Sequence, residues 1–191
     1  MPQDAQHVWP MTRLQLGMVF HTDTETRVGV YHDVFTFRLT AAWVEDPFRR
    51  ALELLQAKHP VLRTSFDLYR YSQPMQIVHD AAPLPLIVDD IRALDEATQD
   101  GHIATFIEQE KRNPFDSETA PLLRVFVHPR GDMDLQITLS FHHAILDGWS
   151  VASLQVELMD VWQRLATGEQ VDLAPLANDM SASIAAEIEA T

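Results

Sequence analysis

The sequence has 191 residues, of which 46% are hydrophobic, and it carries 28 acidic residues, 14 basic residues and no cysteine. This composition excludes a disordered chain and suits one globular domain, and the lack of cysteine excludes disulfides and thiolate metal ligands. The formal net charge of −14 argues against nucleic acid or an anionic membrane as a partner, because both repel an acidic protein. No apolar run is long enough to cross a bilayer and the first residues do not resemble a signal peptide, so we expect a cytoplasmic protein.

The first third of the chain predicts two helices and two strands. A short helix is expected within residues 8–21, and residues 30–39 alternate in the way that is typical of a strand. Asp46 caps a second helix, which ends before Pro60 because proline disfavours helical geometry in the residue that precedes it. The apolar residues 61–66 are expected to form the next strand.

Arg63 lies inside that apolar strand, where an unpaired guanidinium would be costly. We therefore expect a buried acceptor, most simply a carboxylate elsewhere in the chain. The alternative is an edge strand from which the side chain reaches water.

The middle of the chain predicts further strands, a helix and a hairpin, in the order strand 75–78, strand 84–88, helix 101–112 and an antiparallel pair formed by 122–128 and 132–143. Apolar residues then recur at three- and four-residue spacing from 151 to 165, which predicts an amphipathic helix ended by Gly168. The succession of strands and helices predicts an α/β sandwich with a mixed β-sheet.

Polar residues gather between the last predicted strand and the last predicted helix. The alternation of the strand places His143 on its apolar face and His142 on the opposite face, with Asp147 or Ser150 as the helix cap. A general-base site, a metal site and a structural turn are all compatible with these residues. Adjacent histidines on a strand point apart, which disfavours a shared metal ion, and no serine lies in a nucleophile elbow. A histidine base that acts on a bound nucleophile is favoured.

The run from His142 to Gly148 matches the HHxxxDG motif of the condensation domains of non-ribosomal peptide synthetases. These domains are related to chloramphenicol acetyltransferase. Residues 11–21 resemble the first motif of these domains and residues 58–66 resemble the second. The resemblance implies one lobe of the acetyltransferase-like two-layer α/β sandwich, with helices packed on a mixed sheet. It places the N-terminal lobe at residues 1–168 and an acidic connection, toward a C-terminal lobe that the chain lacks, at residues 169–191.

The same resemblance implies roles for the residues of the motif. His143 would position or deprotonate the acceptor amine that attacks a donor thioester, and Gly148 would let the backbone approach the thioester carbonyl. Trp149 and Ser150 would contact substrate.

Three other residues would support the site. His142 would be structural, and the carboxylate of Asp147 would pair with Arg63.

The implied partners are donor and acceptor peptidyl carrier domains of a synthetase of secondary metabolism, which present their substrates on phosphopantetheine. The domain itself would bind neither cofactor nor metal. The first motif resembles domains that join a D-donor to an L-acceptor, and His142 distinguishes the chain from cyclising relatives. The isolated chain would be inactive and would self-associate through its exposed lobe interface. The alternatives are a self-contained oligomeric acyl-CoA acyltransferase and a non-catalytic module that docks carrier proteins.

Overall fold

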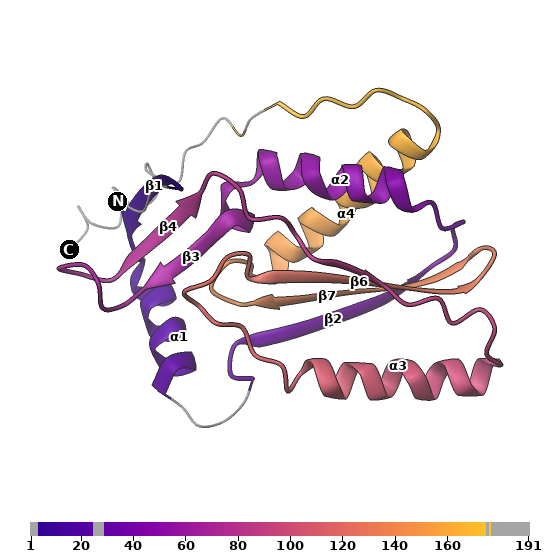
Figure 1. Ribbon diagram of the computed structural model, residues 1–191, viewed down its shortest axis with the longest axis horizontal. Helices are drawn as coiled ribbons and strands as arrows, with labels where there is room; N and C mark the ends of the chain where they lie inside the picture. The colour runs from indigo at the N-terminus through magenta and orange to yellow at the C-terminus, as the bar shows by residue number, and fades with distance from the viewer. Residues whose placement is uncertain (1–3, 25–28, 175, 177–191) are drawn as a thin grey trace.

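The computed structural model describes residues 4–24, 29–174 and 176 (Figure 1). In chain order its elements are β1 (Ala5–Pro10), α1 (Arg13–Thr24), β2 (His32–Leu39), α2 (Glu45–Lys58), the 3-10 helix η1 (Pro60–Arg63), β3 (Thr64–Asp67), β4 (Met75–His79), β5 (Leu86–Val88), α3 (Glu96–Glu110), β6 (Leu123–Gly131), β7 (Asp134–His142) and α4 (Gly148–Ala166).

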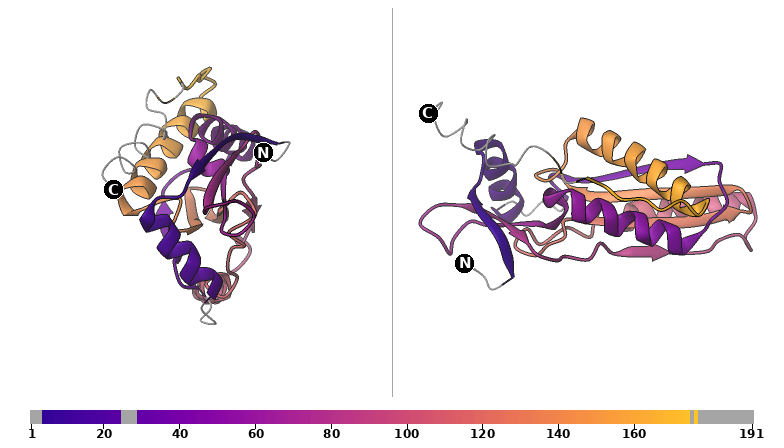
Figure 2. Two further views of the ribbon diagram at one scale, coloured as in Figure 1. Left: turned by 90° about the vertical axis from the view of Figure 1, so that its left-hand side faces the viewer. Right: turned by 90° about the horizontal axis from the view of Figure 1, so that it is seen from above.

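The strands divide between two sheets. An antiparallel three-stranded sheet has the order β1-β4-β3, and a four-stranded sheet has the order β2-β7-β6-β5, in which only the β5–β6 pair is parallel. Helices α2 and α4 lie side by side over one face of the larger sheet, and α3 covers the other face (Figures 1 and 2). The α/β fold class, the mixed sheet and the β6–β7 hairpin are therefore confirmed, and the smaller antiparallel sheet is an element that the sequence did not predict.

The main hydrophobic core lies between the larger sheet and the helices α2 and α4. The apolar residues of β7 are all at most 3% exposed, namely Leu135, Ile137, Leu139 and Phe141. In α4, Leu158 is 2% exposed, and Trp162 packs against Phe48 of α2 with ring centroids 5.3 Å apart. The apolar periodicity of both elements correctly predicted the faces that meet in this core.

The opposite face of the larger sheet is also covered, which the alternation of β7 did not predict. Phe106 of α3 packs on Phe126 of β6 with ring centroids 4.7 Å apart. Near the end of α3, Ser140 Oγ donates to Glu110 Oε1 at 2.6 Å, and Arg124 Nε lies 2.8 Å from the same oxygen. Polar residues of β7 are thus buried beneath α3 because partners there satisfy their hydrogen bonds.

Three predicted boundaries were wrong. The first strand of the hairpin, expected to end at residue 128, continues to Gly131, so the turn lies at residues 132–133. Helix α3 starts at Glu96, well before residue 101, because the Asp95 carboxylate accepts the Thr98 amide at 3.0 Å and caps it. The strand expected at residues 61–66 begins only at Thr64, because Pro60 opens a 3-10 turn through Arg63.

The final part of the chain is only partly described. The residues after α4 up to Ala174 contain no helix or strand, and the weak helix expected at 181–191 lies outside the described residues. None of the helices in the described ranges combines the length and the apolar character that a bilayer span requires.

We expect Leu158→Ala to lower the free energy of unfolding by about 2–5 kcal/mol, because it leaves a cavity between α4 and the sheet. Leu14→Ala is the matched control: Leu14 is 72% exposed on α1, so its truncation should change the stability by no more than about 0.5 kcal/mol. Urea denaturation measures both values. Equal losses would contradict the position of the core.

Candidate active site

The candidate active site lies where β7 ends and α4 begins. Strand β7 ends at His142, a turn follows, and α4 starts at Gly148. The Asp147 carboxylate accepts the Ser150 amide at 2.7 Å, so Asp147 is the helix cap. This hydrogen bond is the main cause that lowers the pKa of Asp147, and the carboxylate stays ionised at neutral pH.

His142 is buried, with 1% of its surface exposed. Its Nδ1 accepts the Ala144 amide at 3.1 Å, so the proton is on Nε2, which donates to Thr22 Oγ1 at 3.0 Å. Burial lowers the pKa of His142 to about 4, and the charges of His32 and His143 act in the same direction. A neutral imidazole therefore ties the turn to α1.

His143 follows the turn and not the strand. The backbone N–H of His143 donates to the Tyr31 carbonyl at 2.7 Å, and its side chain is 39% exposed. The expectation that His143 continues the apolar face of the strand was wrong, because the extended conformation ends one residue earlier.

The Nδ1 atom of His143 lies 2.6 Å from Asp33 Oδ2. An ionised carboxylate accepts a hydrogen bond, so Nδ1 carries the proton and the lone pair is on Nε2. A partly exposed imidazole that is held by a carboxylate is able to take a proton from a substrate.

Asp33 is a residue that sequence reasoning missed. It lies at the start of β2, and the β2–β7 register places it opposite Phe141, two residues before His143. The signal in the sequence is the single acidic residue of this strand, and its role can be read only when the strand that pairs with β2 is known.

Gly148, Trp149 and Ser150 are all exposed. A Cβ added at Gly148 would meet no atom within 4 Å, so open space adjoins the first turn of α4. Trp149 is 86% exposed, and the backbone N–H of Ser150 is occupied by Asp147. The N–H groups of Gly148 and Trp149 have no partner within the helix, because the first turn of any helix lacks them. The Trp149 N–H also contributes weakly to the hydrogen bonding that lowers the pKa of Asp147.

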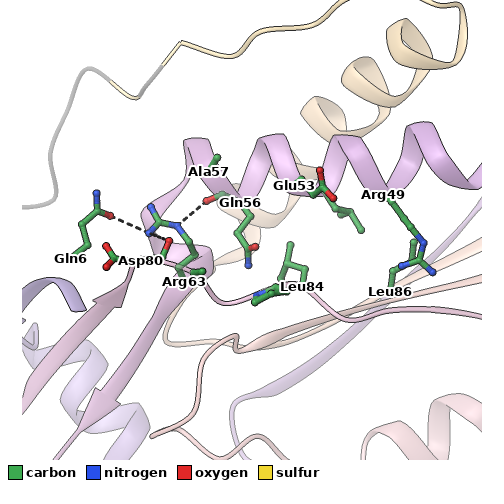
Figure 3. A pocket seen from close by; sticks show the side chains of 12 residues that line it. Gln6, Arg49, Glu53, Gln56, Ala57, Arg63, Asp80, Leu84 and Leu86 are labelled. Carbon is green, nitrogen blue, oxygen red and sulfur yellow. Dashed lines mark hydrogen bonds between the residues drawn. The ribbon is translucent and has the colours of Figure 1, made fainter. Parts of the chain in front are cut away.

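Arg63 does not join this group, and the expected ion pair with Asp147 is absent from the described residues. Its Nε donates to the Gln56 carbonyl at 3.1 Å, and its Nη1 donates to Gln6 Oε1 at 3.0 Å (Figure 3). Nη1 also donates to the His79 carbonyl. The guanidinium lines a cavity of about 550 Å³ beside α2.

The acceptor that Arg63 required is thus mainly backbone carbonyl oxygen, and the alternative of a side chain that reaches water is also wrong, because Arg63 is 7% exposed. Burial is the main cause that lowers the pKa of Arg63, opposed by the charge of Asp80. The 3-10 turn directs the side chain toward the end of α2 and β4, away from the motif.

The α/β architecture, with a histidine turn at the end of a central strand, defines the fold class of the molecule as an acetyltransferase-like α/β sandwich. The chain belongs to the condensation-domain family: the model of that family, described as Condensation domain, matches residues 5–183. The folds of solved relatives agree. The first condensation domain of the CDA synthetase superposes with a TM-score of 0.86 at 17% identity, over 98% of this chain and 46% of that one.

Relatives occur in peptide synthetases. The AMB antimetabolite synthetase AmbE of Pseudomonas aeruginosa is 31% identical over 88% of this chain, and a linear gramicidin synthase of Brevibacillus parabrevis is 33% identical over 91%. The chain spans only 8% and 3% of these two proteins.

The neutral, buried His142 makes stability depend on pH. The unfolded chain binds a proton near pH 6.5 and the folded chain only near pH 4, so stability is highest above 6.5 and falls as the pH decreases toward 4. Between pH 7.5 and pH 5 we expect a loss of about 2 kcal/mol from this residue. Urea denaturation at the two pH values should show a smaller loss for His142→Asn. An unchanged loss would contradict the assignment.

Arg63 and Asp147 should act independently on stability. Arg63→Met removes hydrogen bonds to buried carbonyl groups and should cost about 1–3 kcal/mol, whereas the double variant with Asp147→Ala should show a coupling below about 0.5 kcal/mol. A double-mutant cycle in urea measures this. A coupling of several kcal/mol would restore the ion pair expected from the sequence.

Proposed function

We propose that the chain is the N-terminal lobe of a peptide-synthetase condensation domain and that His143 acts on the amine in amide-bond formation. The observation that carries the proposal is the contact of 2.6 Å between His143 Nδ1 and Asp33 Oδ2, which leaves the Nε2 lone pair for substrate. Membership in the condensation-domain family supports it.

In the proposed reaction the acceptor amine attacks the thioester carbonyl carbon of the donor. His143 Nε2 holds the amine and takes its proton as the C–N bond forms. The C–S bond then breaks, and the same proton passes to the departing thiolate. Orientation of the two substrates can supply roughly 7–11 kcal/mol of the barrier reduction, which explains how one base suffices.

The first turn of α4 adjoins this base and offers a place for the oxyanion. The N–H groups of Gly148 and Trp149 lie at the positive end of a helix of 19 residues, where negative charge is stabilised. The open space at Gly148 lets a carbonyl oxygen approach these donors. Trp149 and Ser150 are the proposed substrate contacts.

The remaining motif residues have supporting roles in this proposal. His142 fixes the turn through Ala144 and Thr22, and Asp147 fixes the start of α4. Arg63 supports the fold by fastening the end of α2 to β4, at a distance from the reacting atoms.

Phosphopantetheine of donor and acceptor carrier domains is the proposed carrier of both substrates. The donor is proposed to be D-configured and the acceptor L-configured, on the resemblance of residues 11–21 to that subtype. The domains are proposed as residues 1–168 for the lobe and 169–191 for a connection toward a C-terminal lobe.

An exposed apolar strip on α4 fits such a second lobe. Trp149 is 86% exposed and Val156 is 70% exposed, and the two lie on one side of the helix because they are about two turns apart. In the absence of the second lobe, we propose that the chain is inactive in condensation and that the strip mediates self-association.

His143→Ala should lower dipeptide formation by about 10²–10⁴-fold when the chain is joined to a C-terminal condensation lobe and supplied with loaded carrier proteins. Product analysis by mass spectrometry measures the rate. His7→Ala is the control, because that residue is exposed on β1, outside the motifs, and should leave the rate unchanged. Equal rates for wild type and His143→Ala would exclude the proposed role.

Asp33→Asn should lower kcat with little change in KM, because the amide no longer fixes the His143 proton on Nδ1. The 15N NMR shifts of His143 should show the proton on Nδ1 in the wild type and a tautomer mixture in the variant. Asp33→Glu should restore part of the activity. A variant with wild-type kcat, or with an unchanged tautomer, would refute the positioning role.

Self-association has a direct measurement. Sedimentation should show a concentration-dependent dimer that Trp149→Ser shifts toward monomer. A stable trimer active on acyl-CoA would instead favour the self-contained acyltransferase. Carrier-protein binding with no loss of condensation in the joined His143→Ala protein would favour a docking module.

A further inference from the structure

A second cluster of ligating side chains lies far along the larger sheet from His143. Asp89, His102 and His128 each offer one ligand atom, and these atoms lie within 4.8 Å of one another. The cluster is remote from the catalytic turn along the sheet, because His128 pairs with Gln136 near the start of β7 and His142 ends that strand.

Three elements of the fold bring these residues together. Strand β5 runs parallel to β6 with Val88 beside Val127, and the Asp89 amide donates to the Val127 carbonyl at 3.0 Å, which places Asp89 next to His128. Helix α3 covers the face of the larger sheet that is opposite α2 and α4 (Figure 1). The ring centroid of Phe106 on this helix lies 4.8 Å from that of His128. His102 is one turn before Phe106 and therefore lies on the same side of the helix.

His128 is the fixed member of the cluster. It is 3% exposed, and its Nδ1 atom is buried with no hydrogen-bond partner. A buried ring nitrogen without a hydrogen-bond partner is an unsatisfied polar atom. Asp89 and His102 complete the set from the surface, with side chains 50% and 40% exposed.

We propose that Asp89, His102 and His128 form a three-ligand zinc site that fastens α3 to the β5–β6 edge. Two imidazoles and a carboxylate suit Zn²⁺ better than Mg²⁺ or Ca²⁺, which prefer oxygen ligands alone. Water takes the fourth position, on the solvent side between Asp89 and His102.

The geometry needs only side-chain movement. In a tetrahedral zinc site the ligand atoms are about 3.3 Å apart. Asp89 Oδ2 and His102 Nε2 are 2.7 Å apart, so they separate slightly and their hydrogen bond is replaced by bonds to the metal. Both residues are exposed enough to move toward the buried His128. The zinc site would hold β5, an edge strand of only three residues, against α3.

Zinc titration of the tag-free chain, after treatment with a chelator, tests the site. Calorimetry should give one zinc ion per chain, and zinc at about 100 times Kd should raise Tm by roughly 5–10 °C. Cobalt in place of zinc should give the visible absorption of a tetrahedral ion. No binding, or an octahedral cobalt spectrum, would overturn the proposal.

Variants then locate the ion. His102→Gln and Asp89→Asn change exposed side chains, and each should weaken zinc binding by at least roughly 10–100-fold. His79→Gln is the matched control, because His79 pairs with the Asp4 carboxylate at 3.1 Å without a third ligand, and it should leave the affinity unchanged. Wild-type affinity in His102→Gln, or a loss in His79→Gln as large as that in His102→Gln, would show that zinc binds elsewhere.

Discussion

The antiparallel pairing of β2 with β7 is the constraint on which the candidate site depends. It sets Asp33 opposite Phe141 and brings the Tyr31 carbonyl to the His143 amide. Tyr31 adopts a left-handed φ of 60°, a conformation that non-glycine residues rarely take, and this turn directs the chain into β2. The two adjacent imidazoles therefore have different environments: His142 is buried, and the partly exposed His143 contacts the Asp33 carboxylate.

The buried face beneath α3 gives this arrangement a rigid base. Thr138 and Ser140 are fully buried there, and Ser140 Oγ lies 2.7 Å from His32 Nε2 and 2.6 Å from Glu110 Oε1. Such a layer is stable only when its polar groups find partners, because an unpaired group in the interior costs about 1–3 kcal/mol. The histidine turn thus rests on a hydrogen-bonded layer on one side and on close-packed apolar side chains on the other.

The patterns of apolar residues predicted which faces of the helices and strands are buried. The apolar periodicity of α4 and the alternation of β7 predicted the faces that pack in the main core. The Pro-Arg-Gly run at residues 129–131 predicted the hairpin, although its turn lies at residues 132–133. The separation of the strands into two sheets was not predictable in this way, because it depends on pairing between distant segments. Arg63 shows the same limit: its need for an acceptor followed from the sequence, but its carbonyl partners depend on where a 3-10 turn directs the side chain.

The partners of the two histidines are distant from them in the sequence. Strand alternation did not predict the environments of His142 and His143, because the strand ends at His142. Their partners, Thr22 and Asp33, come from α1 and β2. Asp95 as the cap of α3 was a local signal that the apolar pattern obscured, because the first turns of that helix are polar.

The distance along the chain between His143 and Asp33, 110 residues, has a consequence for synthesis on the ribosome. Strand β2 emerges early but has no neighbour in its sheet until β7 has been translated, because β2 is an edge strand that pairs with β7 alone. During elongation its unpaired backbone stays open to other chains, and the large sheet forms late through contacts between remote segments. The contact between His143 and Asp33 therefore forms only as the sheet closes, so that a nascent chain completes the candidate site at the same moment as it covers the open edge of β2.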